Sequence, residues 1–367
     1  MLKSSRMKTG ILRQSRRSFI WSAGALAASP LLIAQQAPGG PGPGPSKTPD
    51  ARSIVGLVHG EDRRRNVYES LLAIEDQVLP ILKRKKSVVI KPNLVSTQNQ
   101  VAATHADALR GMLDFLAPRF KGPVFIAESS AGRTWDGYDN FKYTPLPAEY
   151  KPLDLKLVDL NEEGKYEILP VINGDLHAVP VRLAARLLDP DAFVLCAAAM
   201  KTHNVVVATL SIKNMALGAP LRSAPKETPR WNDKRHYHGG VRQTHFDILL
   251  TAQKMKPFWG ATVIDGFEGM EGNGPSNGQP VASRLAIAST DFVAADRVGV
   301  EAMGINPDWI GYLNFCSQAG LGQYDLTKVD IRGPKLADLV KKYSLHGDIE
   351  RELQWMGPLN EIPPKLG

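Results

Sequence analysis

The chain has 367 residues, of which 43% are hydrophobic and 7% aromatic, as expected for a globular protein of one large or two smaller domains. Its formal net charge of +8 would suit a nucleic-acid partner. Residues 1–34, however, contain no acidic residue and six basic ones, namely Lys3, Arg6, Lys8, Arg13, Arg16 and Arg17. The other 39 of the 45 Lys and Arg residues nearly balance the 37 acidic residues, so a nucleic-acid-binding surface is not expected.

Residues 1–37 resemble a bacterial twin-arginine (Tat) signal. Arg16 and Arg17 precede an apolar stretch of about 16 residues, which Gly24 and Pro30 interrupt and which is short for a membrane span. We expect export by the Tat machinery to the periplasm, with cleavage near Ala34 and no stable membrane span afterwards. Retention as an anchor is the alternative if the signal is not cleaved. Residues 38–51 read as a Pro/Gly linker.

The first half of the folded part alternates between strand and helix patterns. Apolar runs predict strands at 53–58, 87–90 and 123–127, and helical spacing predicts helices at 66–83 and 104–116, the second capped by Thr104. This alternation is typical of βαβ units. It predicts an α/β fold with a mainly parallel sheet and helices on both faces.

The second half contains further strand and helix patterns. Residues 131–152 read as a loop insertion, 155–159 and 166–171 as strands of a small β-rich insertion, and 181–188 as a short helix. Strands are then expected at 193–199, 260–264, 283–289 and 329–332, and helices at 204–217, 245–254, 291–303 and 308–319. Asp291 is the expected N-cap of the third of these helices. A domain spanning 52–333 would precede a peripheral helical tail at 334–367.

Polar residues follow four of the predicted strands. They are Lys91 and Asn93; Glu128, Ser129 and Ser130; Lys201 and His203, with Lys213 and Asn214 further on; and Asp265. The carboxyl ends of parallel strands share one edge of a sheet, where open α/β sheets bind ligands. The sequence therefore predicts a ligand cleft at this edge.

Several of these motifs together resemble the bacterial and archaeal family called domain of unknown function 362 (DUF362). The resemblance rests on Lys91-Pro92-Asn93, Lys201-Thr202-His203, Ile212-Lys213-Asn214, Asp265-Gly266, the segment 269–275, the segment 291–296 and Gly320-Leu321-Gly322, and it spans about residues 53–333. The family has no settled activity. Some members carry a Cys-rich, ferredoxin-like segment that this chain lacks, and two cysteines cannot form a Cys₄ iron–sulfur cluster.

The architecture also resembles, distantly, nickel-pincer lactate racemase. In that enzyme a lysine holds the cofactor, and histidines assist the metal and proton transfer.

Three lysines and a histidine are the candidates for chemistry. Lys91, Lys201 and Lys213 could bind a phosphate or carboxylate, or one of them could act as a base or Schiff-base nucleophile. Solvated surface lysines are the alternative. His203 could act as general acid or base, or bind a metal. We expect catalysis from Lys201, His203 and Lys213, and binding of a small anionic ligand by Lys91, Asn93, Asn214 and Asn273.

The Gly-rich stretch 263–280 contains three carboxylates. Asp265, Glu268 and Glu271 would extend on a mobile loop beyond the strand end and form an acidic wall. Such oxygens suit a divalent metal such as Mg²⁺ or could transfer protons, whereas an ordinary surface turn is the alternative. His236 and His238, with His245 beyond, could bind a metal or simply occupy a surface loop.

The sequence contains no P-loop and has no Gly-x-Gly-x-x-Gly motif after the first predicted strand. Cys196 and Cys316 are expected as buried thiols, or alternatively as a disulfide. Two functions remain open: an enzyme that uses proton transfer or metal-assisted chemistry, and a non-catalytic ligand- or cofactor-binding protein of the cell envelope.

Overall fold

The computed structural model describes residues 52–227 and 232–357. The signal and the linker lie outside these residues, so their assignments stay predictions.

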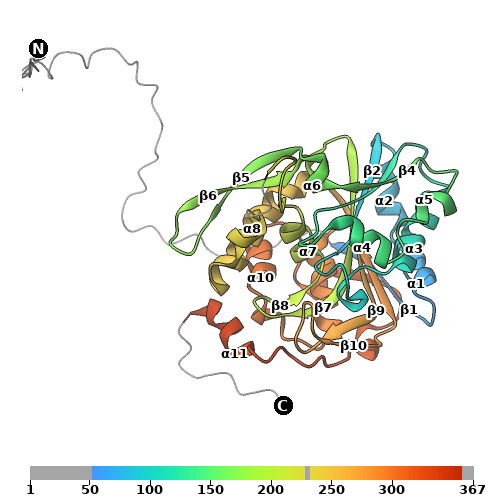
Figure 1. Ribbon diagram of the computed structural model, residues 1–367. Coiled ribbons are helices and arrows are strands. Elements are labelled where there is room, and N and C mark those ends of the chain that lie inside the picture. The colour runs from blue at the N-terminus through green and yellow to red at the C-terminus, as the bar shows by residue number, and fades with distance from the viewer. Residues whose placement is uncertain (1–51, 228–231, 358–367) are drawn as a thin grey trace, which may run out of the picture. The chain divides into compact units, whose positions relative to one another are not determined.

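A central sheet organises the described part of the chain (Figure 1). Its strand order is β12 (Val329–Arg332), β1 (Ser53–His59), β11 (Leu285–Ser289), β9 (Trp259–Glu271), β7 (Ala192–His203), β2 (Ser87–Lys91), β3 (Val124–Glu128) and β4 (Leu155–Asp159). The strands from β9 to β4 are parallel, as is the β12–β1 pair, whereas β11 is antiparallel to both of its neighbours. Two short strands, β8 (Val207–Thr209) and β10 (Gln279–Val281), pair antiparallel with β7 and β9. The predicted mainly parallel α/β fold is confirmed.

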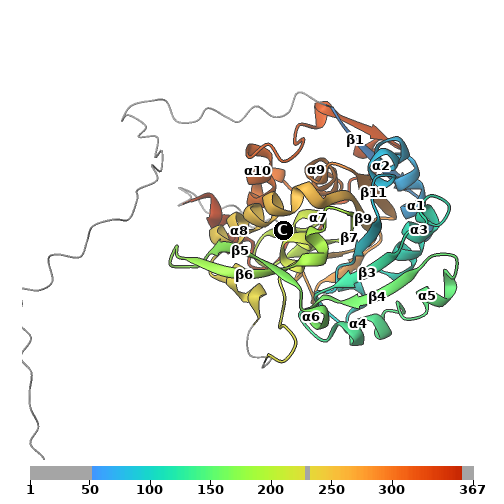
Figure 2. The same ribbon diagram turned by 90° about the horizontal axis from the view of Figure 1, so that it is seen from above.

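Helices cover both faces of this sheet (Figure 2). One face packs against α1 (Arg63–Leu72), α2 (Glu75–Leu82), α3 (Ala106–Leu116), α4 (Thr134–Asn140) and α5 (Leu146–Glu149). The other packs against α7 (Ser211–Gly218), α8 (Val241–Met255), α9 (Phe292–Ala302) and α10 (Gly311–Gln318). Strand side chains alternate between the two cores: Val88 and Ile90 join the first, and Val89 joins the second. Two four-residue helices, α6 (Leu160–Glu163) and α11 (Ile349–Glu352), complete the α-helices of the described chain.

Several local predictions are wrong. Residues 181–188 are not a helix: β6 (Ala178–Ala184) pairs with β5 (Tyr166–Ile172) in a separate hairpin, and a 3₁₀ turn follows. The strand at 155–159 joins the main sheet as β4 rather than the small β-rich insertion. The expected loop at 131–152 contains α4 and α5. The expected helix at 204–217 begins only at Ser211, after β8.

The start of α3 shows why a cap cannot be assigned from residue type alone. His105, not Thr104, is the N-cap, and its Nδ1 accepts the backbone N–H of Asp107. The Thr104 hydroxyl instead accepts the N–H of Asn93 at 2.8 Å and donates to the Ala197 carbonyl at 2.7 Å. Thr104 therefore joins the end of β2 to β7. The prediction for Asp291 is confirmed, because its carboxylate accepts the N–H groups of Val293 and Ala294 at the start of α9.

The largest correction concerns β9. The strand does not end at Asp265 but continues to Glu271. Its edge is covered by β11 as far as Gly266 and by β10 from Gly269 to Glu271, so the three carboxylates belong to a paired strand rather than a mobile loop.

The segment after β12 is mostly irregular, with short turns at 336–339 and 349–356. Tyr343 and Leu353 are buried in the core shared with α7 to α10, so this segment packs against the main domain.

Candidate functional site

A pocket of about 890 Å³ lies beyond the carboxyl ends of β2, β3 and β7. Its walls come from these strand ends, α7, the turn at 232–238, the loop 273–277 and the C-terminal segment 346–348. The volume suits a small organic ligand. The position is the edge that the sequence predicts.

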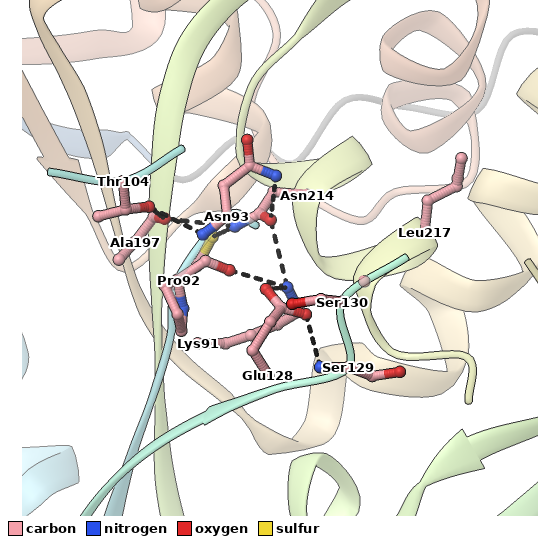
Figure 3. A network of polar contacts seen from close by, with 12 residues as sticks. Lys91, Pro92, Asn93, Thr104, Glu128, Ser129, Ser130, Ala197, Asn214 and Leu217 are labelled. Atoms are coloured by element: carbon pink, nitrogen blue, oxygen red, sulfur yellow. Dashed lines mark hydrogen bonds and ion pairs between the residues drawn. The ribbon is translucent and has the colours of Figure 1, made fainter. Parts of the chain in front are cut away.

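Lys91 is the centre of a buried polar network (Figure 3). Its amino group donates to Glu128 Oε2 at 2.9 Å, to the Pro92 carbonyl at 2.9 Å and to Asn214 Oδ1 at 3.2 Å. Glu128 Oε1 in turn accepts the N–H of Ser129 at 2.7 Å. All three donor positions of the ammonium group are used, so Lys91 is a charged, paired residue at the base of the pocket.

Asn93 and Asn214 extend this network. Asn214 Oδ1 also accepts from Asn93 Nδ2 at 3.0 Å. Asn93 Oδ1, by contrast, is buried and has no hydrogen-bond partner among residues 52–227 and 232–357. Buried acceptors are rarely left unpaired, because each unpaired group costs about 1–3 kcal/mol. An unpaired amide oxygen in a pocket wall is therefore a candidate acceptor for a ligand hydrogen bond.

Buried side chains hold both ends of α7 in place. At its start, Asp296 of α9 accepts the N–H groups of Ser211 at 2.8 Å and Ile212 at 3.0 Å, and the Ser211 hydroxyl at 2.5 Å. Burial raises the pKa of Asp296 to about 7 despite these hydrogen bonds. At its end, Lys234 donates to the carbonyls of Leu217, Gly218 and Pro220 at 2.9, 3.1 and 2.7 Å. These contacts fix where α7 presents its polar side chains to the pocket.

Lys213 differs from the other lysines of the site. Its side chain is 5% exposed and lines the pocket, yet its amino group makes no hydrogen bond or ion pair with the described residues. Burial, and then the charge of Lys91, lower the pKa of Lys213 to about 7. The amine and ammonium forms therefore coexist at neutral pH.

Two histidines of the pocket present opposite polar groups. His203 Nδ1 accepts the backbone N–H of Val205 at 3.0 Å, which places the ring proton on Nε2. His238 Nδ1 lies 2.8 Å from the Lys234 carbonyl and must donate to it, which leaves Nε2 as an acceptor. Burial, followed by the charge of Lys213, lowers the pKa of His203 well below its usual value. The pocket thus contains one neutral imidazole with a free N–H and one with a free lone pair.

The opposite wall carries a single carboxylate, Asp348, which lies 3.3 Å from Arg351, instead of the three predicted carboxylates. It consists of the segments 273–277 and 346–348, and Asn273 Oδ1 accepts the N–H of Gly347 at 3.3 Å. The loop is also held from the β2 side, where Asn99 Nδ2 donates to the Ser276 carbonyl at 2.7 Å.

The structure brings together six of the ten predicted site residues. Those that line the pocket are Lys91, Asn93, His203, Lys213, Asn214 and Asn273. Lys201 does not line it: its amino group donates to the Ala102 carbonyl at 2.6 Å, and its side chain is fully buried. Burial, Lys213 and Lys91 lower the pKa of Lys201 well below the usual value for lysine.

The three carboxylates of β9 also lie outside the pocket lining: Asp265 and Glu268 both approach Arg63, whereas Glu271 contacts Ser344. Asp265 follows Ala261 and Val263 on the strand face that packs with α1 to α5, and there Arg63 Nε lies 3.3 Å from its Oδ2. Glu268 is 4.0 Å from Arg63 and half exposed, whereas Glu271 accepts the N–H of Ser344 at 2.8 Å. Burial raises the pKa of Asp265, and Arg63 opposes this effect.

Within residues 52–227 and 232–357, no group of three or more His, Cys, Asp or Glu side chains is arranged to hold a metal ion. The three histidines considered as metal ligands, His236, His238 and His245, do not all line the pocket. His238 lines the pocket, whereas His245 is buried away from it and accepts the N–H of Tyr312 at 3.0 Å. Metal binding by the β9 carboxylates stays a prediction.

Other candidates have structural roles. The Ser129 hydroxyl contacts Asn161 Oδ1 and the Pro220 carbonyl, at 3.0 and 2.9 Å. Cys196 and Cys316 are both buried free thiols and form no disulfide with each other, which confirms the expectation of buried thiols. None of the helices in the described ranges is long and apolar enough to cross a membrane.

Sequence reasoning missed four contributors: Glu128 as the partner of Lys91, Gly218, Lys234 and the segment 346–348. Glu128 was recognised only as a polar residue at a strand end. Local sequence carries no signal for the others, because their contacts join segments far apart in the chain.

Comparison with known proteins agrees with the motif resemblance. A family described as Domain of unknown function (DUF362) matches residues 88–301. A thylakoid-associated protein of Synechocystis sp. is 26% identical over 239 residues, which cover 64% of this chain and 68% of that protein. A crystal structure of a Thermotoga maritima protein has 10% sequence identity and a TM-score of 0.35, with coverage of 64% of this chain and 57% of that chain. Because the family match spans more than half of the 367 residues, the chain belongs to the DUF362 family.

Proposed function

We propose that this protein is an enzyme that binds a small anionic ligand in the pocket and transfers a proton to or from it through Lys213 and His203. The observation that carries the proposal is the Lys213 amino group, which belongs to a residue only 5% exposed, lies at the pocket wall and has no hydrogen-bond or ion-pair partner among the described residues. A buried amine is costly to protonate, and such groups concentrate at functional sites.

The charge balance favours an anionic ligand. Glu128 already neutralises Lys91 at 2.9 Å, and no carboxylate of the described residues forms an ion pair with Lys213. A carboxylate or phosphate in the pocket would provide the missing counter-charge and would be attracted to both lysines. The free Asn93 Oδ1 would orient a ligand that also carries a hydrogen-bond donor.

The site also supports proton transfer. A base with a pKa near 7 is suited to general acid–base catalysis at neutral pH. The free N–H of His203 and the free lone pair of His238 offer a donor and an acceptor in the same pocket.

Hydrogen exchange into small carboxylates tests this function. Pyruvate and malonate would be incubated with the protein in D₂O and followed by NMR, while titration with propionate measures anion binding. We expect exchange that Lys213→Met abolishes and that Lys156→Met, at an exposed lysine, preserves. Binding without exchange would instead identify the non-catalytic ligand-binding alternative. Absence of both binding and exchange would refute the proposed site.

We also propose export through the twin-arginine route. The support is the Arg16-Arg17 pair before an apolar stretch in residues 1–37. Replacing both arginines by lysine should retain the protein in the cytoplasm, as measured by cell fractionation. Export that continues in the double variant would contradict this assignment.

A further inference from the structure

We infer that Lys213 is a nucleophile that forms an imine with its ligand, so that the pocket takes a small anion that also carries an aldehyde or ketone. The inference deepens the proposed function and rests on it, because the pocket must first hold the anion.

The contacts of the buried lysines single out Lys213. Lys91 and Lys234 each make three hydrogen bonds, and Lys201 donates to the Ala102 carbonyl. Lys213 makes none with the described residues, although its side chain is only 5% exposed. Its nitrogen lone pair can therefore be directed at a ligand atom without breaking any protein contact.

The surroundings keep this amine reactive. The titratable groups that interact electrostatically with Lys213 are all basic, namely Lys91, Lys201, His203, Lys234 and His238. Burial, and then the charge of Lys91, disfavour a positive charge on Lys213. Desolvation beside another cation is a known means of activating a lysine for attack on a carbonyl.

The chemistry needs no reagent beyond the ligand. Lys213 Nζ forms a bond to the carbonyl carbon, and the π electrons of the C=O bond move to the oxygen. The two amine protons are transferred to this oxygen, which leaves as water when the C=N bond forms. His203, with its free N–H, is placed in the pocket to protonate the oxygen, and His238, with its free lone pair, to accept a proton from nitrogen.

Reductive trapping tests the inference. The full chain would be incubated with pyruvate or glyoxylate and sodium borohydride, and then analysed by intact mass spectrometry and peptide mapping. We expect one reduced adduct per chain, located at Lys213, that excess propionate suppresses. Lys213→Arg should remove the adduct, whereas Lys156→Arg, at an exposed lysine, should retain it.

The pH dependence of trapping is a second measurement that requires no variant. Trapping at Lys213 should reach half of its maximum near pH 7. An ordinary lysine has a roughly thousandfold smaller fraction of free amine at that pH.

Trapping that is no faster at Lys213 than at surface lysines would overturn the inference. The inference would also be overturned if propionate binding depended on Lys213 but neither pyruvate nor glyoxylate gave an adduct. In that case the proposed anion site would still stand. Failure of propionate to bind would refute the proposed function itself.

Discussion

Gly218, the last residue of α7, allows the Lys91 amino group to reach its partners. A Cβ atom at this position would lie 2.1 Å from Lys91 Nζ and 2.3 Å from its Cε. Lys91 is fully buried, so its amino group cannot move away into solvent. Gly218→Ala would therefore displace the ammonium group from Glu128 and Asn214 or push α7 away from β2.

The expected cost follows from these two responses. Overpacking that a helix shift relieves costs about 1–3 kcal/mol. Separating a buried ion pair costs about 3–5 kcal/mol, because one charge is left without its partner. We therefore expect Gly218→Ala to lower the free energy of unfolding by about 3 kcal/mol and to weaken propionate binding.

Urea denaturation of a double-mutant cycle would separate this cause from others. In Lys91→Met the ammonium group is absent, so Gly218→Ala should cost at least about 1 kcal/mol less than in the wild type. Gly240→Ala is the matched control, since an added Cβ meets no atom within 4 Å and the backbone is extended. Equal costs of Gly218→Ala in both backgrounds would refute the reasoning.

Three further predictions concern Lys213, Asp296 and His203. In the native state Lys213 takes up its proton only as the pH falls through its pKa of about 7, whereas in the unfolded chain it is already protonated below about pH 10.4. The Lys213→Met variant should therefore be more stable than the wild type by up to about 4 kcal/mol at pH 7, as measured by urea unfolding. A stability difference that does not shrink towards pH 10 would contradict this prediction. Asp296→Ala leaves the start of α7 uncapped, so it should lower the free energy of unfolding by about 2–4 kcal/mol. It should also weaken propionate binding in an NMR titration. Unchanged binding would argue against α7 as the positioning element. His203→Asn can still accept the Val205 N–H but lacks the free ring N–H, and it should slow hydrogen exchange about 100-fold while propionate still binds. Exchange at the wild-type rate would remove His203 from the mechanism.

The fold and half of the candidate site follow from local patterns. Apolar runs of the right length separated by amphipathic segments predict βαβ units, and polar residues directly after Ile90 and Ala127 then fall at one sheet edge. Lys91 and Asn93 reach the pocket for this reason, whereas Lys213 and Asn214 reach it from helix α7. Their adjacency in sequence places both members of each pair near the same wall.

The errors arise where pairing between distant segments decides the outcome. Gly-rich sequence after Asp265 favours a loop, but β11 and β10 supply hydrogen-bond partners and extend β9 to Glu271. Strand alternation then directs Asp265 towards Arg63, on the face away from α7. A residue at the carboxyl end of a strand can still point to the face of the sheet opposite the pocket. The sequence does not reveal which face will hold the pocket.

The expectation of a cleft with lysines on one side and three carboxylates on the other is therefore revised: the wall opposite the lysines carries amide groups and the single carboxylate Asp348. The sequence by itself determined the α/β class, the edge that carries the site and the residue types available there, because periodicity and strand order are local properties. Only the tertiary structure decided which lysines are paired. Contacts between β2, β3 and α7 bury these lysines, pair Lys91 with Glu128 and leave Lys213 without a partner in the part of the chain that the structure describes. The free energy of protonating a lysine depends on its desolvation and on neighbouring charges, and both are set by the packed structure.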